Sequence, residues 1–233
     1  MRDDIKGVAF DLDGTLYPNY RLNIKLVPFI LKEWRLLSAF GKARNIIRRE
    51  QDKGALVKTD FYEYQALITA KILGTQAAPL KEKIEKFIYR GWEPLFKKIK
   101  LFKKVIETLN ALKKAGYKTG LLSDFPPETK LEYLGLYNWG EDGNWDAVLC
   151  SERCGALKPH PLSFKMLAQN MGLAEDKILY VGNSRSYDVT GAFKAGMKTA
   201  WIKNPLFLGS GFKKPKPDFS FSNYRQLYNF MLK

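Results

Sequence analysis

Residues 10 to 15 read Phe-Asp-Leu-Asp-Gly-Thr and follow directly on the apolar run Gly-Val-Ala-Phe at positions 7 to 10. An apolar run that stops at two acids, a glycine and a threonine predicts a buried strand ending in a tight loop. Because the unpaired carboxylates of Asp11 and Asp13 would be costly there, we expect a cation or a basic side chain close by. One chemistry fits this loop: Mg²⁺ held by the acids, one carboxylate attacking a phosphoryl group, and the other moving a proton.

Composition indicates a folded protein without a membrane span. The chain has 233 residues, of which 45% are hydrophobic and 14% aromatic, enough for one large domain or a domain with an insertion. No stretch approaches the roughly 20 apolar residues of a transmembrane helix. The start of the chain, with Asp3 and Asp4 before a short apolar run, does not resemble a secretory signal. We therefore expect a cytoplasmic protein.

The formal net charge of +15 favours anionic partners, either phosphorylated metabolites or nucleic acid. A merely basic, solvated surface is the plainer explanation of the charge. The sequence contains no recognisable nucleic-acid motif, so a small phosphorylated molecule is the expected partner. Cys150, Cys154 and His160 are too few ligands for a zinc site, and we expect both thiols to be reduced.

Two regions of the chain differ in pattern. Between residues 18 and 95, apolar residues recur at helical spacing and strand-like runs are missing. Gly41, Gly54, Gly74 and Pro79 are expected to divide this segment into about four helices. The segment therefore predicts an all-helical insertion, a domain of residues 18–95.

From residue 96 onward, short apolar runs alternate with helical patterns of about ten residues, which predicts a parallel sheet with helices on both faces. The expected fold is thus a doubly wound α/β core, residues 1–17 and 96–233, interrupted by the helical insertion. The expected strands after the first are 117–122, 146–150, 177–181, 198–202 and 218–221. The expected helices are 103–115, 128–134, 162–171, 188–195 and one from residue 224.

Polar residues follow several of these strands. In an open parallel sheet, ligands bind beyond the carboxyl ends of the strands, so side chains placed there converge on one edge. This clustering, rather than any single residue, predicts the site. Its members are Asp11, Asp13, Ser123, Asp124, Lys158, Asn183 and Asp188.

The same residues resemble the motifs of the haloacid dehalogenase (HAD) superfamily, in particular its phosphatase branch. FDLDGT at 10–15 is similar to the first motif, LLSD at 121–124 to the second, Lys158 within KPHP at 158–161 to the third, and VGNSRSYD at 181–188 to the fourth. The resemblance covers residues 1–17 and 96–233, and the helical insertion looks like a cap of the type called C1. It implies the same Rossmann-like core with an inserted cap.

The resemblance also implies roles. Asp11 would be the nucleophile that forms an aspartyl-phosphate, and Asp13 would protonate the leaving oxygen and then deprotonate water. Dehalogenases of this family lack an acid at the second position, so Asp13 argues for phosphoryl transfer. Ser123 would bind a phosphoryl oxygen and Lys158 would offset negative charge. Asp124 would brace Lys158 or the waters of the metal, and we count it with Ser123 and Lys158 among the substrate-binding residues. Taken alone, Ser123 reads more simply as a helix N-cap.

Asn183 departs from the family pattern, which usually has an acid there as a ligand to Mg²⁺. The implied metal ligands are Asp11, Asp13 through its main-chain carbonyl, Asn183 and Asp188. Three interpretations stay open: weaker Mg²⁺ binding, Asp188 as the main ligand, or loss of catalysis.

The reading as a whole is a Mg²⁺-dependent phosphomonoester hydrolase acting on a small phosphorylated metabolite. A phosphomutase and a catalytically silent phospho-ligand or partner-binding protein remain as alternatives. The helical segment contains 15 basic and 8 acidic residues. A few of the basic ones, such as Arg21, Lys25 or Arg49, are expected to attract a second anionic group of the substrate.

Overall fold

The computed structural model describes residues 4–55, 60–139, 144–203 and 215–233. Its centre is a six-stranded sheet in which every pair of neighbouring strands is parallel and the strand order is β3-β2-β1-β4-β5-β6. The strands are β1 (Gly7–Phe10), β2 (Lys118–Ser123), β3 (Ala147–Cys150), β4 (Ile178–Gly182), β5 (Lys198–Ile202) and β6 (Phe219–Phe221). The predicted α/β class and parallel sheet are therefore confirmed, and each predicted strand is present within one residue at either end.

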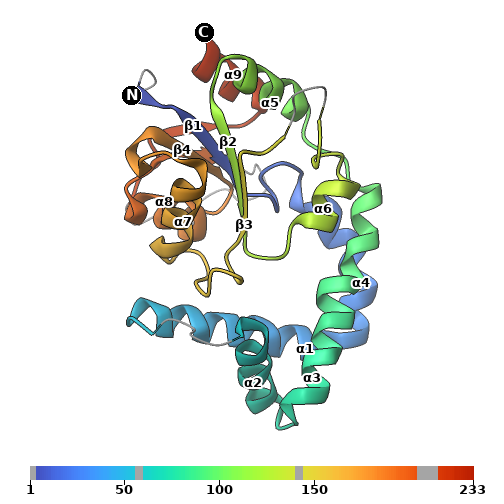
Figure 1. Cartoon of the computed structure of the whole chain (residues 1–233). Coiled ribbons are helices and arrows are strands. Elements are labelled where there is room, and N and C mark those ends of the chain that lie inside the picture. Colours follow the sequence, from blue (N-terminus) through green and yellow to red (C-terminus); the bar gives the residue numbers. More distant parts are fainter. Residues whose placement is uncertain (1–3, 56–59, 140–143, 204–214) are drawn as a thin grey trace.

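Helices cover both faces of the sheet, which explains why β1 and β4 are apolar and buried along their whole length. Val8 and Phe10 of β1 pack in the same apolar cluster as residues of α5 (Val105–Lys114) and α9 (Tyr224–Leu232). Ala9, between them, packs with α7 (Pro161–Met171) and α8 (Thr190–Ala195) on the opposite face. A short helix, α6 (Glu128–Tyr133), follows β2. Figure 1 shows the sheet edge-on between these layers.

The segment between β1 and α5 contains only helices in its described part. They are α1 (Asn19–Asp52), α2 (Phe61–Leu73), α3 (Ala77–Ile84), a π-helical turn η2 (Glu85–Tyr89), α4 (Arg90–Trp92) and a 3₁₀ turn η3 (Glu93–Lys98). Figure 1 shows α1, α2 and α3 at the end of the molecule away from both chain termini. The inserted helical cap is thus present, and the predicted boundary at 95/96 falls within η3.

One prediction about the cap is wrong: Gly41 does not separate two helices. α1 continues through it, and its one non-helical residue is Glu33 (φ −129°, ψ 35°). Gly41 is exposed with open space around it, while its neighbours Phe40 and Ala43 are buried. A glycine in an exposed helix position costs only about 1 kcal/mol relative to alanine, which the packing of the buried face offsets. Gly54 and Gly74 do lie just beyond helix ends, as predicted.

The predicted helix 188–195 is also more complex than expected. A π-helical turn, η5 (Arg185–Val189), comes before α8. A 3₁₀ turn, η4 (Glu175–Lys177), leads into β4. The π-helical turn brings the side chain of Asp188 back over Gly182, where an added Cβ would lie 2.2 Å from the Asp188 Cβ. Glycine at position 182 therefore makes room for the acid.

Candidate active site

The polar residues predicted at the strand ends do meet at the carboxyl edge of the sheet. Asp11 follows β1, Asp124 follows β2, Lys158 lies in the loop after β3, and Asn183 and Asp188 follow β4. All five, together with Asp13, line one cavity of about 350 Å³. The topology of the sheet therefore assembles the predicted cluster from segments far apart in the sequence.

Lys158 is the centre of this cluster. Its Nζ donates to Asp11 Oδ1 at 2.6 Å and to Asp188 Oδ1 at 2.7 Å, and all three side chains are at most 6% exposed. Burial alone would lower the pKa of Lys158, but the Asp11 and Asp188 carboxylates hold it well above its usual value. The lysine is therefore a fixed cation between two acids.

Asp11 is held at both oxygens, since Thr15 Oγ1 donates to its Oδ2 at 2.7 Å. Burial, and after it the repulsion of Asp188, raises the pKa of Asp11 to about 7, against the attraction of Lys158. The positive charge of one lysine does not fully stabilise this carboxylate. A second cation at the site would lower the pKa of Asp11 and keep it ionised.

Asp13 has its own pair of donors. The Tyr17 hydroxyl donates to Asp13 Oδ1 at 2.5 Å, and Lys130 Nζ, from α6, donates to Oδ2 at 2.6 Å. Its side chain is 26% exposed, so it is more accessible than that of Asp11. The two acids of the loop thus have different environments, one deeply buried and one at the cavity wall.

Directly after Asp13, Gly14 has a φ of +89°. A Cβ on Gly14 would lie 2.1 Å from the side-chain nitrogen of Asn183 and 2.3 Å from that of Asn19. A side chain here would therefore be both strained and obstructed, so the loop requires glycine.

The acid and the amide that follow β4, Asp188 and Asn183, have different contacts. Asp188 Oδ2 accepts from the main-chain N–H of Ser184 at 2.9 Å, so both of its oxygens have partners. The main-chain carbonyl of Asn183 accepts from Trp201 Nε1 at 2.9 Å. The Asn183 side chain, in contrast, lines the cavity beside Gly14.

Ser123, the last residue of β2, is fully buried, and its Oγ accepts from the main-chain N–H of Phe125 at 3.2 Å. It does not line the 350 Å³ cavity, whereas Asp124 and Phe125 do. This contact is a local turn after β2 and not a helix cap: α6 begins at Glu128 with Pro127 at its N-cap position, so the N-cap interpretation of Ser123 is wrong. A role in binding a phosphoryl oxygen stays a prediction.

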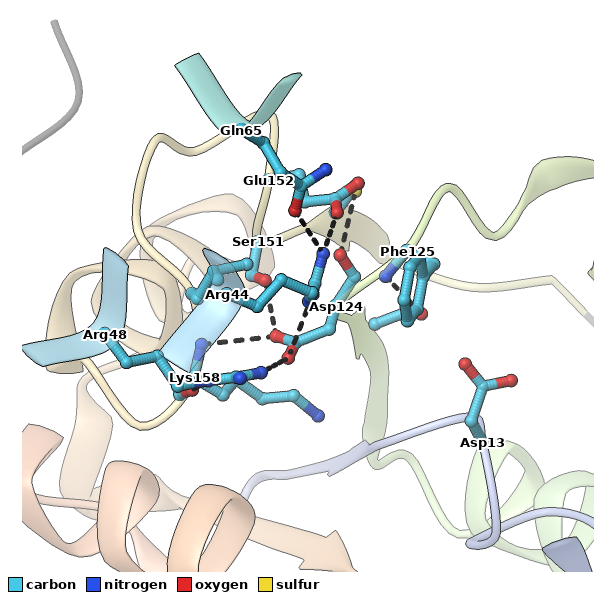
Figure 2. A network of polar contacts seen from close by, with 12 residues as sticks. Asp13, Arg44, Arg48, Gln65, Asp124, Phe125, Ser151, Glu152 and Lys158 are labelled. Atoms are coloured by element: carbon cyan, nitrogen blue, oxygen red, sulfur yellow. Dashed lines mark hydrogen bonds and ion pairs between the residues drawn. The ribbon is translucent and has the colours of Figure 1, made fainter. Parts of the chain in front are cut away.

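The cap contributes two arginines to the cavity, Arg44 and Arg48 of α1. The residues suggested from the sequence, Arg21, Lys25 and Arg49, are not among those that line it. Figure 2 shows both guanidinium groups directed at Asp124. Arg48 Nη2 lies 2.8 Å and Arg44 Nη2 3.4 Å from Asp124 Oδ2, and Ser151 Oγ donates to Oδ1 at 2.6 Å.

Glu152, in the loop after β3, completes this cap–core network. It is fully buried and pairs with Arg44, while the Tyr89 hydroxyl donates to it at 2.8 Å and Gln65 accepts from Arg44 at 3.0 Å. The network of Arg44, Arg48, Asp124 and Glu152 is hereafter called the junction cluster. It places two cap cations against two core acids at the wall of the cavity.

A second cavity, of about 420 Å³, lies beside the first between cap and core. Its walls are largely aromatic and aliphatic, with Ile88, Tyr89 and Trp92 from the cap and Phe125 from the core. Phe125 lines both cavities, and Lys130, which donates to Asp13, lines the second. The second cavity therefore adjoins Asp13 rather than Asp188.

A family model for haloacid dehalogenase-like hydrolases matches residues 5–196, most of the chain. The chain belongs to the haloacid dehalogenase-like hydrolases. A haloacetate dehalogenase H-2 of Moraxella sp. (strain B) is 26% identical over 203 residues, 85% of each chain. A phosphoglycolate phosphatase of Haemophilus influenzae (strain 86-028NP) is 26% identical over 234 residues, 97% of this chain and 98% of the relative. Similar proteins thus include both a dehalogenase and a phosphatase.

The fold agrees with this family. The crystal structure of a HAD phosphatase from Thermococcus onnurineus matches with a TM-score of 0.61 at 21% identity, over 98% of both chains. No helix of the described residues is long and apolar enough to cross a membrane. Cys150 and Cys154, also described, are both free thiols.

The cavity contains oxygen donors of the kind that Mg²⁺ binds. In the described part of the chain, no three His, Cys, Asp or Glu side chains come together as a metal site. Mg²⁺, however, is commonly held by one or two carboxylates and completes its shell with water and substrate phosphate. Asp11, the Asp13 carbonyl and the Asn183 side-chain oxygen are oxygen donors of this kind, so the residues present fit a weakly charged Mg²⁺ site.

Four residues at or beside the site were not predicted from the sequence: Lys130, Glu152, Arg44 and Arg48. The arginines did carry a signal. Arg44 and Arg48 are one turn apart and directly follow the buried Ala43 and Ile47, on the buried side of α1. Cations within an apolar helix stripe indicate buried partners. Lys130 and Glu152 had no such distinguishing context.

Proposed function

We propose that this HAD-like hydrolase is a Mg²⁺-dependent phosphomonoester hydrolase that acts through an aspartyl-phosphate. One observation carries the proposal. A buried carboxylate, Asp11, is paired with Lys158 in a cavity where a second, more accessible carboxylate, Asp13, is available for proton transfer. A carbon–halogen bond breaks without protonation of the leaving group, whereas an alkoxide leaving group needs a proton.

In the first proposed step, an oxygen of Asp11 forms a bond to phosphorus while the bond from phosphorus to the ester oxygen breaks. Asp13, in its protonated form, gives its proton to that departing oxygen, which leaves as an alcohol. In the second step, Asp13 takes a proton from water as the water oxygen attacks phosphorus, and the bond to Asp11 breaks. Phosphate leaves, and both acids return to their starting states.

Lys158 supports both steps by electrostatics. Its ammonium is already 2.6 Å from the nucleophile and is held in place by Asp188, so little reorganisation is needed as charge develops on the phosphoryl oxygens. Asp188 thus acts on the reaction through Lys158 and through the Ser184 N–H that it binds.

Mg²⁺ would be held by Asp11, the Asp13 carbonyl and Asn183, with Asp188 nearby, and would neutralise charge between Asp11 and the phosphoryl group. Since Asn183 supplies no charge, we expect a lower affinity than a site with an acid at that position would have.

The substrate is proposed to be a small phosphorylated molecule. Its phosphoryl group would occupy the 350 Å³ cavity, and its leaving oxygen would lie next to Asp13. The organic part would then extend past Lys130 toward the aromatic second cavity. A cytoplasmic location is part of the same proposal and agrees with the two free thiols.

The proposal is tested by incubating the purified protein with para-nitrophenyl phosphate, and separately with haloacetate, in Mg²⁺ or in excess chelator. Release of phosphate that stops with chelator supports it, whereas release of halide alone identifies a dehalogenase. A panel of sugar phosphates tests the mutase alternative, since isomerisation without free phosphate contradicts hydrolysis. No turnover of any compound contradicts the proposal and favours a phospho-ligand-binding protein.

A further inference from the structure

We propose that Arg48 and Asp124 are positioning residues that hold the main chain of Lys158, so that contact between α1 of the cap and the core sets the position of the catalytic lysine. This inference rests on the proposed function, in which Lys158 is catalytic. It assigns to a cap residue an effect on the chemical step, in addition to any effect on substrate access.

The main chain of Lys158 is held on both sides. Its N–H donates to Asp124 Oδ1 at 3.2 Å, and its carbonyl accepts from Arg48 Nε at 2.8 Å. Arg48 Nη2 and Asp124 Oδ2 are themselves 2.8 Å apart. The three residues therefore form a closed ring of charge-assisted contacts around one peptide segment, and Figure 2 shows them side by side.

The three members come from different parts of the fold. Arg48 lies in α1 of the cap, Asp124 follows β2, and Lys158 follows β3. Gln51, one turn after Arg48, adds two contacts to the same loop: its Nε2 donates to the Gly155 carbonyl at 2.8 Å, and its Oε1 accepts from the Leu157 N–H at 3.1 Å. Moving α1 away would therefore break three contacts to residues 155–158 at once, the one from Arg48 and the two from Gln51.

Binding of a second substrate anion is the competing role for a cap arginine at this cavity. The contacts of Arg48 argue against it. Its Nε and Nη2 are engaged by Lys158 and Asp124, Nη1 donates to Asn45 at 3.4 Å, and its guanidinium stacks 4.3 Å from the centre of the Tyr187 ring. Because its charge is already paired with Asp124, Arg48 is better suited to holding other residues in place than to binding a substrate anion.

Three variants distinguish positioning of Lys158 from binding of a second substrate anion: Arg48→Lys, Arg48→Met and the control Arg49→Met. They are assayed with para-nitrophenyl phosphate, which carries no second anion. Lysine keeps the charge but cannot donate to Lys158 and Asp124 through one planar group. We expect kcat to fall about 100-fold in both Arg48 variants, as for a misplaced catalytic group, with KM changed less than threefold. Arg49 is exposed and should tolerate methionine with unchanged kcat. Full kcat in Arg48→Lys, or a loss confined to KM, overturns the proposal.

A double-mutant cycle tests the ring independently. If Arg48 and Asp124 act as one unit, the double variant Arg48→Met with Asp124→Asn should have a kcat within about threefold of the worse single variant. Multiplied losses would overturn the proposal. Thermal unfolding of each variant identifies any that fail to fold, in which case Arg48→Lys decides.

The failure of the two proposals can be told apart. If the wild-type protein hydrolyses no phosphate ester, the proposed function is wrong and this inference falls with it. If the wild type is active and Arg48→Lys is equally active, only the positioning role is wrong.

Discussion

Two sets of buried charges, both next to the same cavity, are organised differently. In the core, Lys158 lies between Asp11 and Asp188, and all three belong to loops of one sheet. In the junction cluster, Arg44 and Arg48 belong to the cap and their acids, Asp124 and Glu152, to the core. Lys158 belongs to both, through its ammonium to the first set and its main chain to the second.

The difference indicates which charges depend on cap position. All three members of the core set lie in loops of the core, so their ion pairs need no cap residue, whereas the proposed positioning of the Lys158 main chain does. The junction cluster exists only when α1 contacts the loops after β2 and β3, since otherwise the buried Glu152 and the partly buried Asp124 lose their cap cations. The core set is thus suited to chemistry, and the junction cluster to linking cap closure with that chemistry.

A large effect on catalysis is expected at Asp13, which lines the same cavity but belongs to neither set and contacts Tyr17 and Lys130 instead. Asp13→Asn should lower kcat for an alkyl phosphate by about 10²–10⁴-fold, because the departing oxygen loses its proton donor. Stability should change little, since the side chain is partly exposed. Steady-state phosphate release measures the effect. Equal activity of Asp13→Asn and wild type would contradict the assignment of the proton carrier.

Lys158→Met and Arg44→Met compare the two sets directly. Each removes a buried cation from two acids, so each should lower the free energy of unfolding by about 3–5 kcal/mol. Their activities should differ: the folded Lys158→Met protein should be inactive, whereas Arg44→Met should retain measurable kcat. Chemical denaturation and phosphate release on the same samples provide the comparison. An active Lys158→Met protein would show that the core set does not serve catalysis.

Asp124 gives the junction cluster a defined pH dependence. Burial alone would raise the pKa of Asp124, but Lys158, Arg44 and Arg48 outweigh it and hold the pKa well below its usual value. A depressed folded-state pKa contributes stability that is present above the unfolded-state pKa of about 4 and is lost as pH falls toward the folded-state value.

Asp124→Asn should therefore lower the free energy of unfolding at pH 7 by about 2 kcal/mol, as expected for hydrogen bonds to charged groups. The difference in the free energy of unfolding between Asp124→Asn and wild type should narrow progressively below pH 4. Denaturant unfolding at pH 7, 5, 4 and 3 measures it. A gap of constant size over this range would mean that the charge of Asp124 does not stabilise the junction cluster.

Asn183→Asp should have a smaller effect, confined to the metal. An added carboxylate should lower the Mg²⁺ concentration for half-maximal activity by about tenfold. A Mg²⁺ titration of phosphate release measures it, and Asn19→Asp provides a neighbouring control at the same cavity. An unchanged Mg²⁺ dependence would show that position 183 does not contact the metal.

Much of the core could be predicted from the sequence because short apolar runs alternate with helices. Once a parallel sheet was inferred, its topology required Asp11, Lys158 and Asp188 to meet at one edge. The contacts that these residues make could be predicted less directly from the sequence. The π-helical turn that brings Asp188 over Gly182 leaves no distinct sequence pattern.

The cap was harder to predict because helical periodicity gives a buried face but not the surface it contacts. Glycine favours a helix break at position 41, but the packing around Phe40 carries α1 through it. Arg44 and Arg48 lie among buried apolar residues, yet their acids, Asp124 and Glu152, are 76 or more positions away. Only the docking of α1 on the core relates them.

The most direct test of the account is whether Asp11 forms the covalent bond. Purified Asp11→Asn, with Asp52→Asn as a control for an exposed acid of α1, should be mixed with a phosphate ester in Mg²⁺ and rapidly quenched in acid. The account predicts phosphorylated wild-type and Asp52→Asn protein by mass spectrometry, and neither phosphorylation nor turnover in Asp11→Asn. Turnover of Asp11→Asn at the wild-type rate would contradict it.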